Sequence, residues 1–122
     1  MNAYFFDSYA FFEMLKGNPD YAAYEKDTAF VTTKLNLLEL HYGLLLEKGG
    51  KVADSCFARF ESRAVDFDSE ILKEASRFRA AHKKMGLSYI DCIGYVMAKF
   101  MGVKFLTGDR GFKDMKSVEF VQ

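Results

Sequence analysis

The chain has no tryptophan, a single proline and only two cysteines, and it contains no long hydrophobic run. Cys56 and Cys92 are far apart and form neither a C-x-x-C motif nor a zinc-binding spacing, which favours free thiols in a reducing compartment. No segment approaches the roughly 18 apolar residues of a membrane span. The N-terminal stretch MNAYFFDSYAFF has no basic region and carries Asp7 inside its apolar run, unlike a secretory signal. We therefore expect a soluble cytoplasmic protein without a membrane partner.

A net charge of either sign is also absent. Lys plus Arg and Asp plus Glu both number 17, so the formal net charge is zero. A chain with this balance has no global attraction to nucleic acid or to a membrane surface. Any binding of a polyanion must come from a local cluster of basic side chains.

The sequence does contain enough apolar material for a core. Its 122 residues suit one domain, 1–122, and are too few for two. Hydrophobic residues make up 50% of the chain and aromatic residues 16%. This amount fills a core and leaves apolar side chains over, so we expect a partner surface or a homodimer.

Short aromatic or β-branched runs alternate with longer helical patterns. The short runs predict strands at 3–6, 29–32, 64–67, 103–107 and 118–121. The longer patterns predict helices at 8–17, 19–27, 33–50, 51–63, 69–86 and 88–100. This alternation predicts an α/β fold, a single doubly wound domain with about five mostly parallel strands and helices on both faces.

Two acids directly follow predicted strands. Asp7 comes after the strand at 3–6, and Asp109 follows the strand at 103–107 with only Gly108 between. In doubly wound folds, ligands bind outside the carboxyl ends of the strands. Each acid also fits a local role, since Asp7 can cap the helix that follows and Asp109 can be a turn residue.

Two further acids lie in apolar helices that begin at the same edge. Glu39 sits in LNLLELHYGLL, about 9 to 10 Å along its helix at 1.5 Å per residue, and this helix is apolar on nearly every side. Asp91 occupies the first turn of SYIDCIGYVMAKF, where it also fits a capping box with Ser88. We expect the four carboxylates to converge at one end of the sheet.

Such a cluster requires a positive partner. Two unit charges about 4 Å apart repel by about 4 kcal/mol at an effective dielectric of 20. An all-oxygen set favours Mg²⁺ or Mn²⁺ over zinc, and His41 and His82 make no metal spacing with each other. A carboxylate-held Mg²⁺ activates water and stabilises charge on phosphate oxygens, which indicates a nucleic-acid phosphodiester as substrate.

Basic residues cluster near the last acid. They could hold the backbone of a polyanion, or they could form an ordinary solvated face around a strand and a turn. These residues are Lys104, Arg110, Lys113 and Lys116.

The ordered segments FFDS, NLLELHYGL, SYIDCIGYVMA and FLTGDRGF resemble the four acidic motifs of the PIN-domain ribonucleases, particularly the VapC-type toxins of prokaryotic toxin–antitoxin pairs. The resemblance implies a PIN-like fold, RNA as substrate, Mg²⁺ or Mn²⁺ as cofactor, a homodimer, and a cognate antitoxin that covers the acidic pocket. It implies that the metal-binding and catalytic acids are Asp7, Glu39, Asp91 and Asp109.

The resemblance also assigns supporting residues. Ser8 is the hydroxyl residue that often follows the first acid, and Thr107 is the one that precedes the last. Asp114 is a possible fifth acid acting through water, although a turn residue also fits it. The sequence departs from the family at Leu38, where a small or hydroxyl residue is common before the glutamate.

Two other activities of doubly wound folds do not fit the sequence. An aspartyl phosphatase requires a second Asp where Tyr9 stands, and a mononucleotide binder requires a Gly-rich loop that DSYAFF lacks. Two alternatives stay open: a solitary RNA-processing PIN nuclease, and a PIN domain that binds RNA or protein without cutting. The presence of all four acids favours catalysis.

Overall fold

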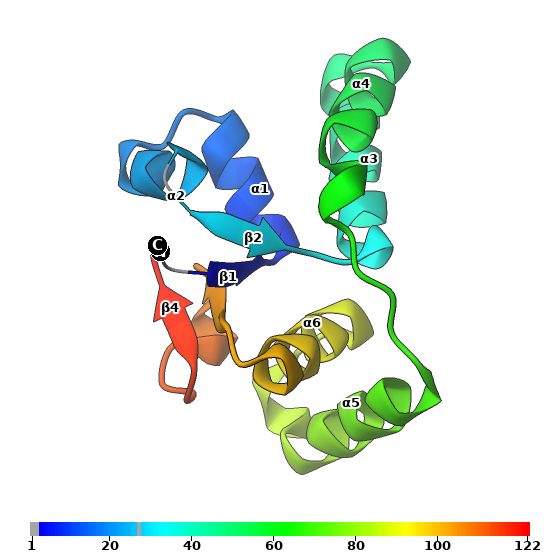
Figure 1. The fold of residues 1–122 in the computed structure, drawn as a ribbon, viewed down its shortest axis with the longest axis vertical. Helices are drawn as coiled ribbons and strands as arrows, with labels where there is room; N and C mark the ends of the chain where they lie inside the picture. Colours follow the sequence, from blue (N-terminus) through cyan, green and yellow to red (C-terminus); the bar gives the residue numbers. More distant parts are fainter. Residues whose placement is uncertain (1–2, 27) are drawn as a thin grey trace.

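Four short strands form one parallel sheet in the computed structural model, which describes residues 3–26 and 28–122. The strands are β1 (Ala3–Phe6), β2 (Ala29–Val31), β3 (Lys104–Thr107) and β4 (Val118–Phe120), in the order β2-β1-β3-β4. Every pair is parallel, and β1 lies between β2 and β3 (Figure 1). The predicted α/β class with a mostly parallel sheet is therefore confirmed.

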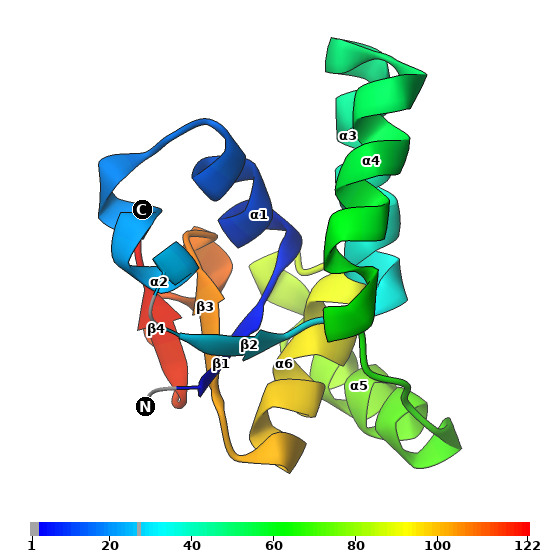
Figure 2. The ribbon, with the colours of Figure 1, turned by 45° about the horizontal axis from the view of Figure 1, so that its top comes forward.

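Helices cover both faces of this sheet. Figures 1 and 2 show α1 and α2 on one side of it, α5 and α6 on the other, and α3 and α4 as a long pair beside β2. None of the helices in the described ranges is long and apolar enough to cross a membrane. The helices are α1 (Ser8–Leu15), α2 (Ala22–Lys26), α3 (Lys34–Lys48), α4 (Gly50–Phe60), α5 (Ser69–Ala81) and α6 (Tyr89–Met101). The predicted last residue of the 19–27 helix, Asp27, lies outside the described residues.

Alternating side chains of the central strand divide the core into two parts. Tyr4 and Phe6 pack with α1, α3 and α4, whereas Phe5 packs with α5 and α6. This is the period of two expected for a strand that is buried on both faces. The ring of Phe5 stacks on Phe105 of β3 at 5.7 Å between centroids, and the ring of Phe6 stacks on Phe30 of β2 at 4.2 Å.

The predicted strand at 64–67 is wrong, so the described sheet has four strands where about five were expected. Ala64 forms only an isolated bridge with Thr32, and the Val65 amide donates to the Thr32 carbonyl at 2.8 Å. Asp68 then caps α5 by accepting from the Ile71 amide at 3.1 Å. The capped helix α5 begins at Ser69, so the chain leaves the sheet after a single bridge.

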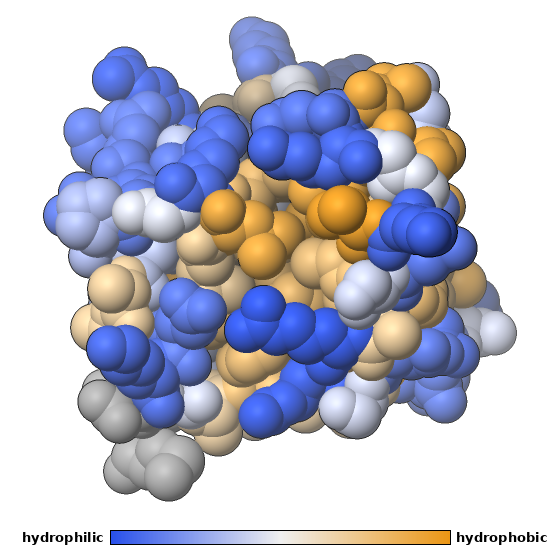
Figure 3. All heavy atoms as spheres, turned by 90° about the horizontal axis from the view of Figure 1, so that it is seen from above, coloured by the Kyte–Doolittle hydropathy of each residue, from blue (hydrophilic) through white to orange (hydrophobic). Residues whose placement is uncertain are grey.

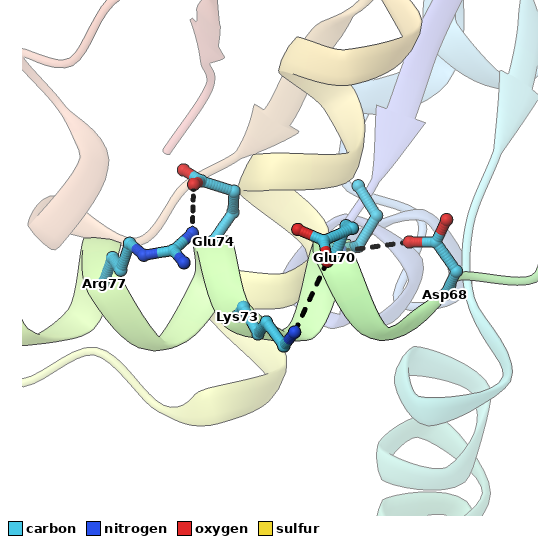
Figure 4. Close-up of polar contacts among 6 residues, drawn as sticks. Asp68, Glu70, Lys73, Glu74 and Arg77 are labelled. Atoms are coloured by element: carbon cyan, nitrogen blue, oxygen red, sulfur yellow. Dashed lines mark hydrogen bonds and ion pairs between the residues drawn. The ribbon is translucent and has the colours of Figure 1, made fainter.

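Charged side chains on the exposed face of α5 form ion pairs with each other. Figure 4 shows Asp68 at the start of α5 and the pairs Glu70–Lys73 and Glu74–Arg77 along it. These pairs join residues three apart on one helix face and are solvent-exposed, so each adds little to stability.

Gly94 of α6 generates a prediction about packing. A Cβ at this position would lie 2.9 Å from Phe5 Cε1 and 3.1 Å from Phe105 Cε1, so a methyl group forces the helix away from the sheet. We expect Gly94→Ala to lower the free energy of unfolding by about 1 to 3 kcal/mol in urea titrations followed by circular dichroism. Gly50→Ala is the matched control, because the nearest atom there is 3.9 Å away. Equal effects of the two substitutions would contradict this packing.

Candidate functional site

Four acids from separate elements line one pocket beyond the carboxyl ends of β1 and β3. The pocket has a volume of about 410 Å³ and is bordered by α1, α3 and α6. Its lining includes Asp7, Glu39, Asp91 and Asp109, together with Ser8, Tyr9, Phe12, Tyr42 and Gly43. The structure thus brings together the four carboxylates that the sequence analysis singled out.

Asp7 is the most buried of the four, with 3% of its surface exposed. Its Oδ1 accepts from the Ala10 amide at 2.9 Å and so caps α1. Its own amide donates to the Leu106 carbonyl at 3.4 Å, which ties the end of β1 to β3. The buried Thr107 hydroxyl also hydrogen-bonds the Asp7 carboxylate. Asp7 is therefore fixed by a helix end and by a neighbouring strand.

Asp91 and Asp109 are held by local caps as well. Asp91 Oδ2 accepts from the Ser88 amide at 2.9 Å, while the Asp91 amide donates to Ser88 Oγ at 3.1 Å, a complete capping box. Asp109 Oδ1 accepts from the Gly111 amide at 2.9 Å, and the Asp109 amide donates to Thr107 Oγ1 at 3.0 Å. The capping roles that the sequence left open are real, and both acids also line the shared pocket.

Glu39 is held by a side chain from a different helix. Its Oε1 accepts from Ser8 Oγ at 2.5 Å, which links α3 to the first residue of α1. The other carboxylate oxygen of Glu39, and likewise that of Asp109, makes no hydrogen bond within residues 3–26 and 28–122. Each of these two acids thus has an oxygen available toward the pocket.

The pocket carries excess negative charge. Burial, together with the charges of Asp91 and Asp109, raises the pKa of Asp7 to about 7, against opposing hydrogen bonds from Thr107 and Ala10. Burial raises the pKa of Glu39, and so does the charge of Asp91. No ion pair in the described part of the chain includes any of the four acids. A proton or a cation would relieve this repulsion.

The donor set suits a hard divalent cation. Carboxylate oxygens are the ligands that Mg²⁺ and Mn²⁺ prefer. Among the residues that the structure describes, no three His, Cys, Asp or Glu side chains are already arranged to hold one ion. A cation at this pocket would need the acids to stand closer together than they do in the described structure.

The histidines lie elsewhere. His41 Nε2 is 2.7 Å from Asp54 Oδ1, between α3 and α4. His82 Nδ1 lies 2.9 Å from the carbonyl oxygen of Phe78, at the end of α5. Neither histidine lines the acidic pocket.

The predicted basic residues are not all at this edge. Arg110 directly follows Asp109 and is exposed, as is Lys113. Lys116 is exposed too, but it precedes Ser117, whose carbonyl accepts from the Phe105 amide, so it lies at the amino end of β3 and β4, away from the acids. Lys104 begins β3, at the opposite end of the strand from the acids, and its Nζ is 3.8 Å from Glu119 Oε1. Asp114 is exposed and does not line the pocket.

Sequence reasoning missed two polar residues behind Glu39. Asn36 has 1% of its surface exposed and hydrogen-bonds Ser8, and Thr33 caps α3. The signal was present in the sequence as T-x-x-N-x-x-E. Residues spaced by three lie on one face of a helix, so Thr33 and Asn36 stand in line with Glu39.

The family model described as PIN domain matches residues 4–118. No curated protein matches the chain.

Three solved structures illustrate the likeness of fold. A toxin-antitoxin complex from Klebsiella pneumoniae has a TM-score of 0.76 at 14% identity, with 94% of each chain covered. DNA-bound VapBC from Salmonella typhimurium has a TM-score of 0.74 at 18% identity, covering 99% of this chain and 98% of that one. FitAcB from Neisseria gonorrhoeae has a TM-score of 0.73 at 19% identity, covering 97% and 96%.

The raised pKa of Asp7 generates a stability prediction for the metal-free protein. Folding raises this pKa from 3.8 to about 7, so the folded state holds the proton more tightly. The resulting stability is complete below pH 3.8 and is lost as the pH rises through 7. Asp7→Asn keeps a side chain that can cap α1 and removes the charge. We expect it to raise the free energy of unfolding by on the order of 4 kcal/mol at pH 8 and by little at pH 4, at about 1.4 kcal/mol per pKa unit.

Urea titrations in EDTA at the two pH values measure this difference. Exposed Asp66, for which the structure gives no hydrogen bond or ion pair, supplies the control Asp66→Asn, which should change neither value. A stabilisation by Asp7→Asn that is the same at pH 4 and pH 8 would show that the Asp7 charge is not its cause.

Proposed function

The chain belongs to the PIN domain family, and from this premise we propose that it is a metal-dependent endoribonuclease and the toxin of a toxin–antitoxin pair. The observation that carries the proposal is the acidic pocket, where four carboxylates meet without a cationic partner in the described residues. A pocket of this charge repels an RNA phosphate unless a cation stands between them. A nuclease with Mg²⁺ or Mn²⁺ as cofactor accounts for the four unpaired carboxylates and for the approach of an RNA phosphate to them.

In this scheme each acid has a distinct place. Asp7, Asp91 and Asp109 hold the cation, and Glu39 completes the site directly or through water. When bound, Mg²⁺ or Mn²⁺ supplies an activated water and charge stabilisation on the scissile phosphate. Thr107 orients two of the acids, because its hydroxyl bonds the Asp7 carboxylate and accepts from the Asp109 amide.

The RNA backbone is expected to enter beside Asp109. Arg110 is exposed and adjacent to that acid, so it is the basic residue best placed to contact a phosphate next to the reacting one. Lys113 lies farther along the same loop. Lys104 and Lys116 are left out of this role, because both lie at the amino end of β3 and β4, away from the acids.

An antitoxin partner and a homodimer belong to the same proposal. The three solved structures compared above include a toxin-antitoxin complex and a VapBC complex, which supports a protein partner for this fold. Figure 3 shows hydrophobic side chains gathered on one face of the molecule among hydrophilic ones. The α3 and α4 pair exposes several large apolar side chains that a partner could cover, namely Leu38, Tyr42, Leu45, Leu46 and Val52.

Cleavage of total cellular RNA tests the activity. Wild-type protein with Mn²⁺ should cut RNA and leave 5′-phosphate ends, and EDTA should abolish cleavage. Asp91→Asn keeps an oxygen that can accept from the Ser88 amide, so the helix cap survives while a charged ligand is lost. We expect a loss of at least about 100-fold in rate for this variant and no change for the control Asp66→Asn.

Other results have defined meanings. Cleavage that persists in EDTA, or 2′,3′-cyclic ends, would contradict a metal-activated water. Equal cleavage by wild type and Asp91→Asn would return Asp91 to a purely capping role. Binding of RNA without cleavage would favour the non-catalytic alternative. The lack of a short gene just upstream encoding a DNA-binding protein would favour a solitary RNA-processing nuclease.

A further inference from the structure

A chain of polar groups runs behind Glu39 from the start of α3 to the start of α1. Thr33 Oγ1 lies 2.7 Å from Asn36 Oδ1, and Asn36 Nδ2 lies 3.3 Å from Ser8 Oγ. Ser8 Oγ lies in turn 2.5 Å from Glu39 Oε1. The two inner members, Thr33 and Asn36, are almost fully buried, with 0% and 1% of their surfaces exposed.

The direction of the first link is set by the backbone. The Asn36 amide donates to Thr33 Oγ1 at 3.2 Å, as the N-cap of α3 requires. A backbone N–H can only donate, so the Thr33 oxygen acts as acceptor here. The Thr33 hydroxyl therefore has its one hydrogen left for Asn36 Oδ1.

This first link determines the others. With Oδ1 engaged by Thr33, the Asn36 amide must turn its NH₂ group to Ser8 Oγ. Ser8 then has a single hydrogen and two acceptors in reach, the Asn36 carbonyl at 3.3 Å and Glu39 Oε1 at 2.5 Å. The nearer and charged acceptor wins, because hydrogen bonds to a carboxylate are shorter and stronger.

We propose that Asn36 is a positioning residue for Glu39, acting through the Ser8 hydroxyl. Its NH₂ group donates to Ser8 Oγ and so holds the hydroxyl where its single hydrogen points to Glu39 Oε1. This bond between α1 and α3 fixes the carboxylate of Glu39 at the pocket. The inference rests on the proposed function only where Glu39 is taken to serve a bound cation. The hydrogen-bond direction itself is a property of the metal-free chain.

A merely structural role does not explain this side chain. Thr33 already caps α3, and the position faces a core in which Leu37 and Leu40 are buried. An amide at such a position needs its partners to offset the loss of water. Here two of those partners, Thr33 and Ser8, lie in a line that ends on Glu39.

The test uses the full chain with Mn²⁺ as the probe. We expect Asn36→Ala and Ser8→Ala each to weaken Mn²⁺ binding by about 10-fold in calorimetric titrations, the size typical of lost support for a metal ligand. The double variant should be no weaker than the weaker single variant, because both act through one route. Asn18→Ala is the matched control, since Asn18 Nδ2 donates to Glu13 Oε1 at 2.9 Å away from the pocket.

A second readout needs no metal. In the metal-free protein at one fixed pH, the ¹³C resonance of the Glu39 carboxyl should move in the same direction in Ser8→Ala and Asn36→Ala, and not in Asn18→Ala. If Asn36→Ala does not fold, Asn36→Ser replaces it, because serine keeps a polar group at position 36 yet is too short to reach Ser8.

The outcomes separate the two claims. If the wild type binds no Mn²⁺ while the resonance moves as expected, the proposed function fails and the positioning role stands. If Asn36→Ala only lowers the free energy of unfolding, with Mn²⁺ affinity and the Glu39 resonance unchanged, the positioning role is overturned. Additive losses of affinity in the double variant would overturn it as well.

Discussion

The parallel pairing of β1 with β3 is the constraint on which the site depends. Phe6 is in register with Leu106, so the next residues along both strands emerge at the same edge. Asp7 is tied there by its amide to the Leu106 carbonyl, and the Thr107 hydroxyl bonds its carboxylate. Gly94 lets α6 pack onto Phe5 and Phe105, and Asp91 lies one turn before that contact. The core of the sheet therefore sets the spacing of three acids.

Local caps make a repulsive cluster possible. Each of Asp7, Asp91 and Asp109 receives a backbone N–H at a helix or turn start, which holds a carboxylate in place even as burial and like charges act against it. Repulsion remains, since burial and neighbouring acids raise the pKa of Asp7 to about 7. A chain selected for stability alone would place an amide there. Unrelieved charge at a fixed geometry is typical of functional sites.

Much of this arrangement could be predicted from the sequence because it follows from strand order. Asp7 and Asp109 follow the strands that became β1 and β3, so a parallel sheet places both acids at its carboxyl edge. The apolar surroundings of Glu39 indicated burial. The strand at 64–67 was wrong because a bridge at Ala64 gives way to the Asp68 cap of α5. Asn36 was missed because a buried amide looks like any helix residue until its partner from α1 is known. Lys104 was grouped with the basic residues near Asp109, but it begins β3 and so lies at the end of the strand opposite to the acids.

The most direct test of the central claim is anomalous diffraction at the manganese edge from crystals grown with Mn²⁺. The account predicts a peak in the pocket within coordination distance, about 2.0 to 2.3 Å, of Asp7, Asp91 and Asp109, with these carboxylates turned from their present contacts toward the ion. A pocket without a peak at millimolar Mn²⁺, or a peak held by other residues, would contradict the claim that these acids form a cation site.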